Sequence, residues 1–282
     1  MDQAKCAAGR VVEMEGILQI RAEQKGERTV ITDHFFQGAL KMTKPVYTES
    51  SIPIVYVIHV GGGCVDGDEY AQEISLGEKA KLAVTSQSST KIYKTPKKPV
   101  KQKFLFTLQK DSVLEYLSDP LIVYEQARFE QETIVHMEKG AAFLYKEIIT
   151  PGWSETGQPF CFDAIRLKLK VYKENRLILF DHFYQQGDQG IDQLLNMEGY
   201  THYGSFLVIS DEVDDKLMEK ISCQLQGGPF DGRIGISRFL PSAFMIRILG
   251  NHTDHIEGLF LEVHRLARAY LLKEPPILLR KY

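Results

Sequence analysis

The stretch HVGGGCVDGDEYAQEISLGEKAKLAVTSQSSTKIYKT, residues His59–Thr95, sets the pattern for the rest of the chain. An apolar run, Ile54–Val60, leads into it and predicts a buried strand. Three successive glycines then permit backbone conformations that a Cβ atom would penalise. Two further strands follow, separated by a turn at Gly77, and they lead into the densely polar segment Ser86–Lys91. Because polar side chains are costly to bury, we expect this segment to face water or a partner.

The glycine-rich turn differs from the common nucleotide-binding and calcium-binding motifs. A P-loop requires Gly-Lys followed by Ser or Thr, and the chain contains no such tripeptide. A dinucleotide-binding fingerprint needs a small residue where the chain has Asp66, and a helix where Glu69–Leu76 alternates like a strand. An EF-hand counted from Asp66 needs a bidentate glutamate at the position of Gly77. We therefore interpret the turn as a structural element or a partner surface.

Composition and charge are those of an ordinary soluble protein. The chain has 282 residues, of which 44% are apolar and 25% charged, and its formal net charge is −3. This charge argues against general nucleic-acid binding, and no apolar run reaches the roughly 18 residues that a membrane span requires. The N-terminus leads into no hydrophobic stretch and no C-x-x-C pair occurs, so we expect reduced thiols and a cytoplasmic location. The cysteines are Cys6, Cys64, Cys161 and Cys223.

A weak internal repeat runs through the middle of the chain. In each copy an apolar residue is followed by a charged or glycine-containing turn and then by two apolar residues spaced two apart. The copies start at Leu76, Leu108, Met137 and Val171. We interpret each copy as a hairpin, and the solenoid-like period of roughly thirty residues predicts that the copies stack. The predicted fold is mainly β, with stacked antiparallel or β-helical strand layers; the alternative is an ordinary antiparallel sheet, which yields similar matches.

Two helices are predicted near the C-terminus. The first begins around Ser210–Val213, and its apolar face includes Leu217 and Ile221. The second covers His252–Leu272, with Asn251 as its N-cap. We expect their apolar faces to cover the sheet. Because no linker interrupts the chain, we predict one domain over residues 1–282, with the first fifteen residues flexible.

No catalytic motif is present. The chain lacks a Gly-x-Ser-x-Gly elbow and a His-Glu-x-x-His pair, so we expect a protein that is not an enzyme. A mixture of imidazole, thiol and carboxylate that suits nickel or zinc occurs within a short stretch, at His59, Cys64, Asp66 and Asp68. Turn stabilisation explains the same residues. His252 and His255 are a second candidate pair, for which a capped first helical turn is the alternative explanation.

Ordered motifs of another kind extend over nearly the whole chain. They are Gly61-Gly-Gly-x-x-x-Gly-Asp68, Thr85-Ser-Gln-x-x-Thr-Lys-x-Tyr93, Leu114-Glu-Tyr-x-x-Asp-Pro120, Ala127-Arg-Phe129, Thr150-Pro-Gly-Trp153 and Tyr200-x-His-Tyr-Gly204. With these motifs in this order, the chain resembles the urease accessory protein family UreD, also called UreH. The similarity extends from about Asp33 to the closing Tyr282.

The resemblance implies a non-catalytic chaperone for nickel insertion into urease, acting with the accessory proteins UreF and UreG and with the urease apoprotein. It implies a helix-like stack of strands with two α-helices, no tightly bound cofactor, and Ni²⁺ in transit along an internal route. Transient ligands would be His59, Asp66 and Asp68, whereas Cys64 lies outside the family pattern. The alternative function is a stand-alone nickel-binding or storage protein. Candidates for lining the route or contacting partners are Gly61, Gly62, Gly63, Thr85, Gln87, Lys91, Tyr93, Glu115 and Asp119.

Overall fold

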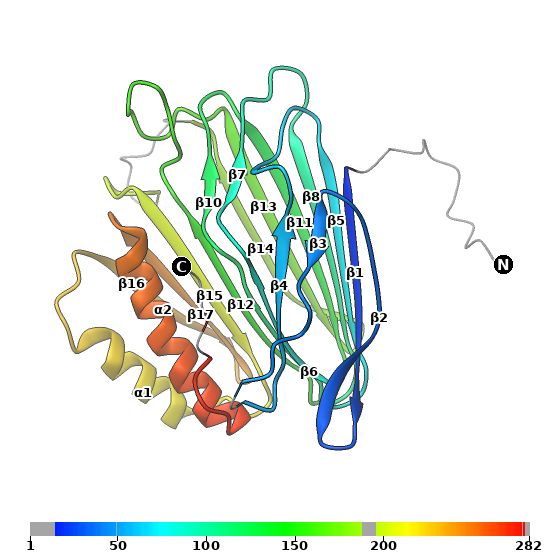
Figure 1. Ribbon diagram of the computed structural model, residues 1–282. Helices are drawn as coiled ribbons and strands as arrows, with labels where there is room; N and C mark the ends of the chain where they lie inside the picture. Colours follow the sequence, from blue (N-terminus) through cyan, green and yellow to red (C-terminus); the bar gives the residue numbers. More distant parts are fainter. Residues whose placement is uncertain (1–14, 49, 188–195, 278, 280–282) are drawn as a thin grey trace.

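The computed structural model describes residues 15–48, 50–187, 196–277 and 279. Within these ranges the chain is largely strand, and the two α-helices both lie near the C-terminus (Figure 1). The predicted flexible segment lies, except for Glu15, outside the described residues. The helices are α1 (Asp215–Gln226) and α2 (Thr253–Ala267), and a π-helical turn (Arg268–Leu272) continues α2. The strands are β1 (Gly16–Lys25), β2 (Arg28–Gly38), β3 (Leu40–Met42), β4 (Ile54–His59), β5 (Glu69–Leu76), β6 (Lys81–Ser86), β7 (Thr90–Ile92), β8 (Val100–Leu108), β9 (Val113–Leu117), β10 (Leu121–Val123), β11 (Arg128–Met137), β12 (Ala142–Ile149), β13 (Ala164–Lys173), β14 (Arg176–Gln185), β15 (His202–Ile209), β16 (Gly232–Leu240) and β17 (Ala243–Gly250).

Successive coils of the chain stack on one another through parallel strand pairs. β5, β8, β11 and β13 pair in this way in a seven-stranded sheet, and β4, β6, β9 and β12 do so in a ten-stranded sheet. The register is continuous from coil to coil: Ile74 lies opposite Phe106, and Phe106 lies opposite Val135. β7 and β10 form a short third row, which isolated bridges extend to Cys64 at one end and Trp153 at the other. The predicted β-helical stacking is confirmed.

Three of the four repeated segments are corners of this stack, so the prediction of hairpins is wrong for them. At the first corner β5 ends at Leu76 in one sheet and β6 begins at Lys81 in the other, and these strands do not pair. Only the segment at Val171 is a hairpin, between β13 and β14. A corner and a hairpin both place apolar residues on either side of a polar turn. The sequence pattern is therefore the same, and only the pairing partner differs.

Antiparallel pairs lie at the ends of both sheets. In the seven-stranded sheet the strand order is β14-β13-β11-β8-β5-β1-β2, and its two outermost pairs are antiparallel. The path through the ten-stranded sheet is β16-β17-β15-β12-β9-β6-β4-β3, with antiparallel pairs at both ends. The parallel stack is thus bounded on both sides by strands that run against it.

Two apolar layers hold the fold together. Between the sheets, inward side chains alternate with outward ones, as in β8, where Phe104 and Phe106 are buried and Lys103 is exposed. Aromatic rings of the two sheets pack there, with the Phe106 and Tyr116 centroids 5.0 Å apart. A second cluster fills the space between the ten-stranded sheet and the helices, where Phe206 meets α2. Because each large apolar side chain stabilises the fold by about 1.5–3 kcal/mol when fully buried, these layers supply most of the favourable free energy.

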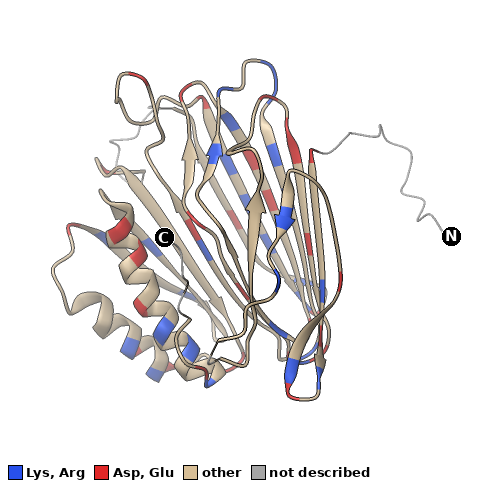
Figure 2. Ribbon diagram, in the orientation of Figure 1, with Lys and Arg blue, Asp and Glu red and all other residues tan. Residues whose placement is uncertain are grey.

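The outer face of the seven-stranded sheet carries charges in rows. Glu130 pairs with Arg166 at 3.6 Å and Glu132 with Lys170 at 2.9 Å, in each case between β11 and β13. Figure 2 shows the resulting acidic and basic stripes along adjacent strands. Exposed ion pairs contribute only about 0–1 kcal/mol each, so these rows chiefly keep the face hydrated.

The two predicted helices exist, but their starts differ from those expected. α1 begins after Asp214, whose carboxylate accepts the Leu217 N–H at 2.9 Å, and therefore later than Ser210–Val213. Asn251 is not the N-cap of α2, because its Oδ1 accepts the Thr201 N–H instead. His252 takes the N-cap position without a side-chain hydrogen bond. Neither described helix is long and apolar enough to span a membrane.

A buried charge cluster fastens α2 to the ten-stranded sheet. The Glu115 carboxylate in β9 lies 2.5 Å from His264 Nε2 and accepts a hydrogen bond from Arg268 Nε at 3.1 Å. Arg268 is fully buried, and its remaining nitrogens donate to Ser50 Oγ and to the Pro275 carbonyl. Glu115 therefore joins segments that are far apart in the sequence, and its role in this position is structural.

Replacing Glu115 with Ala should lower the free energy of unfolding by about 3–5 kcal/mol, because Arg268 would remain buried without its counter-charge. Urea denaturation followed by circular dichroism measures the change. The double replacement Glu115→Leu with Arg268→Met should recover part of the loss. A loss below about 1 kcal/mol for Glu115→Ala would contradict the anchoring role.

Candidate functional site: a polar cavity inside the strand stack

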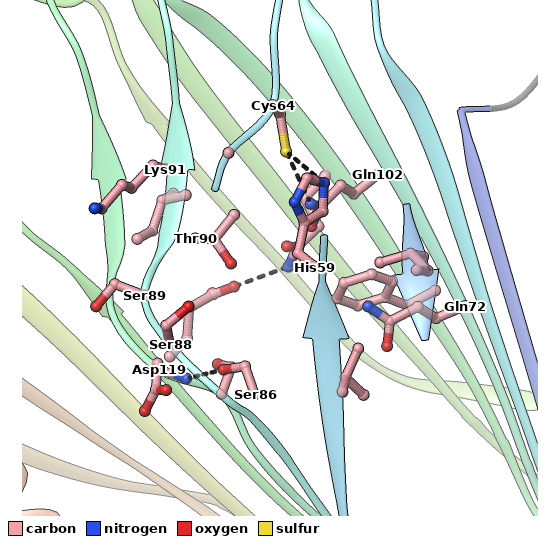
Figure 3. A pocket seen from close by; sticks show the side chains of 18 of the residues that line it. His59, Cys64, Gln72, Ser86, Ser88, Ser89, Thr90, Lys91, Gln102 and Asp119 are labelled. Carbon is pink, nitrogen blue, oxygen red and sulfur yellow. Dashed lines mark hydrogen bonds between the residues drawn. The ribbon is translucent and has the colours of Figure 1, made fainter. Parts of the chain in front are cut away.

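A cavity of about 160 Å³ lies between the two sheets and opens near the glycine-rich turn. Side chains from successive coils line it, and Figure 3 shows His59, Cys64, Gln72, Gln102 and Asp119 around the space. Its walls are unusual for the interior of a strand stack because many of them are polar. Since buried polar groups need hydrogen-bond partners, such a lining requires either an internal network or a polar occupant.

A row of hydrogen-bonding side chains crosses the cavity from one sheet to the other. In the seven-stranded sheet Gln102 lies directly opposite Gln131. Gln131 Nε2 donates to Tyr145 Oη at 3.1 Å and to Glu147 Oε1 at 2.9 Å, and Tyr145 Oη donates to the same carboxylate oxygen at 3.0 Å. One coil earlier, Tyr116 Oη donates to Gln72 Oε1 at 3.0 Å. Tyr116 lies directly opposite Tyr145, so the parallel register repeats the phenol in neighbouring coils, whereas Gln72 lies opposite Phe104 and outside the Gln102–Gln131 row.

Glu147 is the cavity's most perturbed acid. It is partly buried and lines the cavity. Burial raises the pKa of Glu147 to about 7, although hydrogen bonds from Tyr145 and Gln131 oppose the shift. Near neutral pH this carboxyl therefore exchanges readily between its acid and its anion. It can give up a proton to accept a cation.

The polar lining continues beyond Glu147. A small space of about 10 Å³, enough for roughly one water molecule, shares Gln131, Tyr145 and Glu147 with the main cavity. Its far side includes Asp181, which forms an ion pair with Arg247 at 2.5 Å. Polar groups therefore run in sequence from the glycine turn to the opposite end of the strand stack.

At the mouth, His59 and Cys64 lie side by side. His59 Nε2 is 3.8 Å from Cys64 Sγ, and the imidazole packs edge-on against the Tyr70 ring with centroids 5.0 Å apart. Burial lowers the pKa of His59, and the Asp68 carboxylate opposes this shift. Burial, with a smaller contribution from Asp68, raises the pKa of Cys64 to about 12. Near pH 7 the pair is thus a neutral imidazole beside a thiol.

The two predicted carboxylate ligands stabilise turns. Asp66 Oδ1 accepts the backbone N–H groups of Lys97 and Lys98, each at 2.8 Å, and the pKa of Asp66 is lowered mainly by the Lys98 bond. Asp68 Oδ2 accepts the Val65 N–H at 2.7 Å and the Tyr70 hydroxyl at 2.8 Å. Among the described residues, no three His, Cys, Asp or Glu side chains converge in a way that would hold a metal ion. The structure does not gather His59, Asp66 and Asp68 into one closed centre.

The other sequence candidates divide between the cavity and its surroundings. Thr85 is buried and donates to the Leu117 carbonyl at 2.6 Å, which ties β6 to β9. Tyr93 packs on Tyr124 outside the cavity, and a Cβ at Gly63 would come within 2.6 Å of the Tyr93 ring. Gly61 and Gln87 are exposed, and Glu115 faces α2. The candidates that line the cavity are His59, Gly62, Gly63, Lys91 and Asp119.

Sequence reasoning missed the deepest residues of the cavity. Gln102 and Gln131 occupy inward positions of β8 and β11, where the alternation otherwise places apolar side chains. A polar residue at such a position is a readable signal, because it must be satisfied inside the fold. Glu147 follows the buried Tyr145 at the same spacing in β12, so an inward acid was also visible in the sequence.

These features define a class: a β-solenoid protein with a polar interior cavity and with helices covering one sheet. The UreD urease accessory protein family matches residues 14–281 of the chain. The urease accessory protein UreD of Bacillus sp. (strain TB-90) is 46% identical over 267 residues, covering 95% of this chain and 98% of the relative. Those of Lachnoclostridium phytofermentans and Staphylococcus aureus (strain bovine RF122) are 39% and 35% identical, again over 95% of this chain and 98% of each relative. The chain belongs to the UreD urease accessory protein family.

Glu147→Gln should remove a pH-dependent component of stability. A carboxyl whose pKa is higher in the folded than in the unfolded state stabilises the fold below the unfolded value of 4.5, and this contribution is lost as pH rises through about 7. Glutamine stays neutral at every pH. The free energy of unfolding of the variant, relative to that of the natural chain, should therefore rise by up to about 3 kcal/mol between pH 4.5 and pH 8.

Urea denaturation at pH 5 and pH 8 measures this difference. The exposed Glu78→Gln is the matched control, and its effect should be the same at both pH values. An equal stability difference for Glu147→Gln at both pH values would show that the acid is not held in its neutral form.

Proposed function

We propose that this protein is a non-catalytic chaperone that scaffolds nickel insertion into apo-urease, in complex with UreF-type and UreG-type accessory proteins in the cytoplasm. Family membership supports a role in urease maturation. The observation that supports the finer proposal is the pair of polar cavities inside the strand stack, which share Glu147 in their lining. In this proposal Ni²⁺ is cargo and not a resident cofactor.

The side chains that line the cavity suit an ion that binds only transiently. Amide, phenol and carboxylate oxygens are ligands of modest affinity for a borderline ion such as Ni²⁺. Closed sites with several strong ligands hold metals tightly, and the described residues contain no group of three such ligands. Glu147 can release its proton when a cation arrives and recover it when the cation leaves. Weak successive sites favour passage over storage.

The proposal assigns energy-dependent steps to a partner. The chain has no P-loop sequence, so nucleotide hydrolysis would belong to the UreG-type protein. The second candidate function, a stand-alone nickel-binding or storage protein, is favoured only by the ligand-type residues at the cavity mouth.

Removing carboxylates from the cavity lining should reduce urease activation. Glu147→Ala and Asp119→Ala should each lower urease activity by roughly tenfold in cells that co-express urease and all accessory proteins, because a cation would lose an anionic group on its route. Lys91→Ala and Asp68→Ala test the mouth in the same assay. Urease specific activity and bound nickel are the measurements.

Glu78→Gln is the control, since this exposed side chain lies outside the cavity. Co-purification of each variant with the UreF-type partner separates a blocked route from a lost complex. Full urease activation by the Glu147→Ala, Asp119→Ala double variant would rule out the interior route.

Nickel titration distinguishes the chaperone from the store. Equilibrium dialysis of the purified chain should give a Kd for Ni²⁺ in the micromolar range or weaker, as expected for incomplete coordination. Tight, stoichiometric binding would favour the storage function instead.

A further inference from the structure

The turn that opens the cavity holds an imidazole and a thiol in a fixed arrangement. His59 is the last residue of β4, and the glycine turn brings the chain back so that Cys64 pairs with the third row of strands. The Cys64 N–H donates to the Lys91 carbonyl at 2.8 Å, and the Tyr93 N–H donates to the Cys64 carbonyl at 2.9 Å. Cys64 is fully buried, and both side chains line the cavity (Figure 3).

We propose that His59 and Cys64 together bind a borderline or soft transition-metal ion such as Ni²⁺ at the cavity mouth. This site rests on the function proposed above, and it would be the first binding site on the route of the ion. Metal–nitrogen and metal–sulfur bonds to such ligands are about 2.1 Å and about 2.3 Å long. These lengths are those of zinc sites, and with Nε2 and Sγ 3.8 Å apart they give an N–metal–S angle of about 120°, near the tetrahedral value. The angle of about 90° that square-planar Ni²⁺ prefers would require the two atoms to approach each other to about 3.1 Å.

An ion would replace weak contacts of the two ligand atoms. His59 Nδ1 is buried and has no hydrogen-bond partner among the described residues beyond a contact with its own backbone. Gln102 Nε2 donates a weak hydrogen bond to the Cys64 sulfur at 4.0 Å, and the Tyr70 hydroxyl also interacts with that sulfur. The Asp68 carboxylate interacts electrostatically with both His59 and Cys64 and would attract a cation. In Figure 3 the Lys91 side chain points away from His59.

Binding at this pair forms a metal–nitrogen and a metal–sulfur bond, and two water ligands leave the ion. The S–H bond of Cys64 breaks, its proton goes to solvent, and the sulfur keeps the electron pair that it donates to the metal. Two protein ligands leave the other coordination positions to water, so the ion stays exchangeable. A thiolate adds selectivity for borderline and soft ions over Mg²⁺ and Ca²⁺, which the oxygen ligands deeper in the cavity do not provide.

The test uses a chain with Cys64 as its only thiol, made by Cys6→Ser, Cys161→Ser and Cys223→Ser. Addition of Ni²⁺ should produce a near-ultraviolet sulfur-to-nickel charge-transfer band. Adding Cys64→Ser should abolish the band and weaken Ni²⁺ binding by tenfold or more in equilibrium dialysis, as loss of one strong ligand requires. His59→Asn should weaken binding to a similar extent.

Cys64→Val, which keeps the buried volume, provides a second variant in case Cys64→Ser fails to fold, and circular dichroism checks both. Absence of the band in the single-thiol chain, or its persistence after Cys64→Val, would overturn the site. Urease activation is assayed separately. Failure of the natural chain to activate urease would reject the proposed function without changing the absorption result, whereas loss of the band in variants that still activate urease supports the site and shows that passage does not require it.

Discussion

In-register parallel pairing of successive coils is the constraint on which the rest of the molecule depends. It sets Gln102 opposite Gln131 and Tyr116 opposite Tyr145, so that like side chains stack at a spacing of about 4.8 Å. A shift of one residue would turn the glutamines outward and bring Lys103 or Glu132 into the core. The apolar core and the polar cavity are therefore fixed by the same hydrogen bonds, and neither can change register without the other.

Strand content and the two helices could be predicted because alternation and amphipathic spacing are local signals. The partner of each strand could not, since a corner and a hairpin share one pattern and differ only in what lies a coil away. The same limit applies to Glu115, which stands in a recognisable motif beside Tyr116. Neighbouring residues of a strand face opposite sides, so Tyr116 reaches the interior while Glu115 meets α2. Which face of β9 points into the space between the sheets depends on how the coils stack, and stacking cannot be read from neighbouring residues.

In the candidate site, too, some residues could be predicted from local sequence and others only from the fold. Residues of the glycine turn, such as His59 and Gly63, could be found because turn chemistry is visible in sequence. Asp66 and Asp68 look like ligands at that level, yet backbone N–H groups and a tyrosine hydroxyl occupy one oxygen of each carboxylate and hold it in a turn. Glu147 is distant in sequence from the turn and joins it only through the fold. The buried cluster around Arg268 also joins remote segments, at Ser50, Glu115 and Pro275, and a network of this kind favours one docking position for the helix over its alternatives.

The outermost strands of the seven-stranded sheet, β2 and β14, run antiparallel to their neighbours and close the stack whatever the number of coils between them. β2 and β14 terminate the stack, whereas each interior coil repeats its neighbour. Duplication of the unit from β8 to the corner before β11 would add one coil and lengthen the strand stack by about 4.8 Å while both terminating strands keep their own partners. The length of the stack can thus change by whole coils through duplication within the gene. The surfaces at its two ends stay the same.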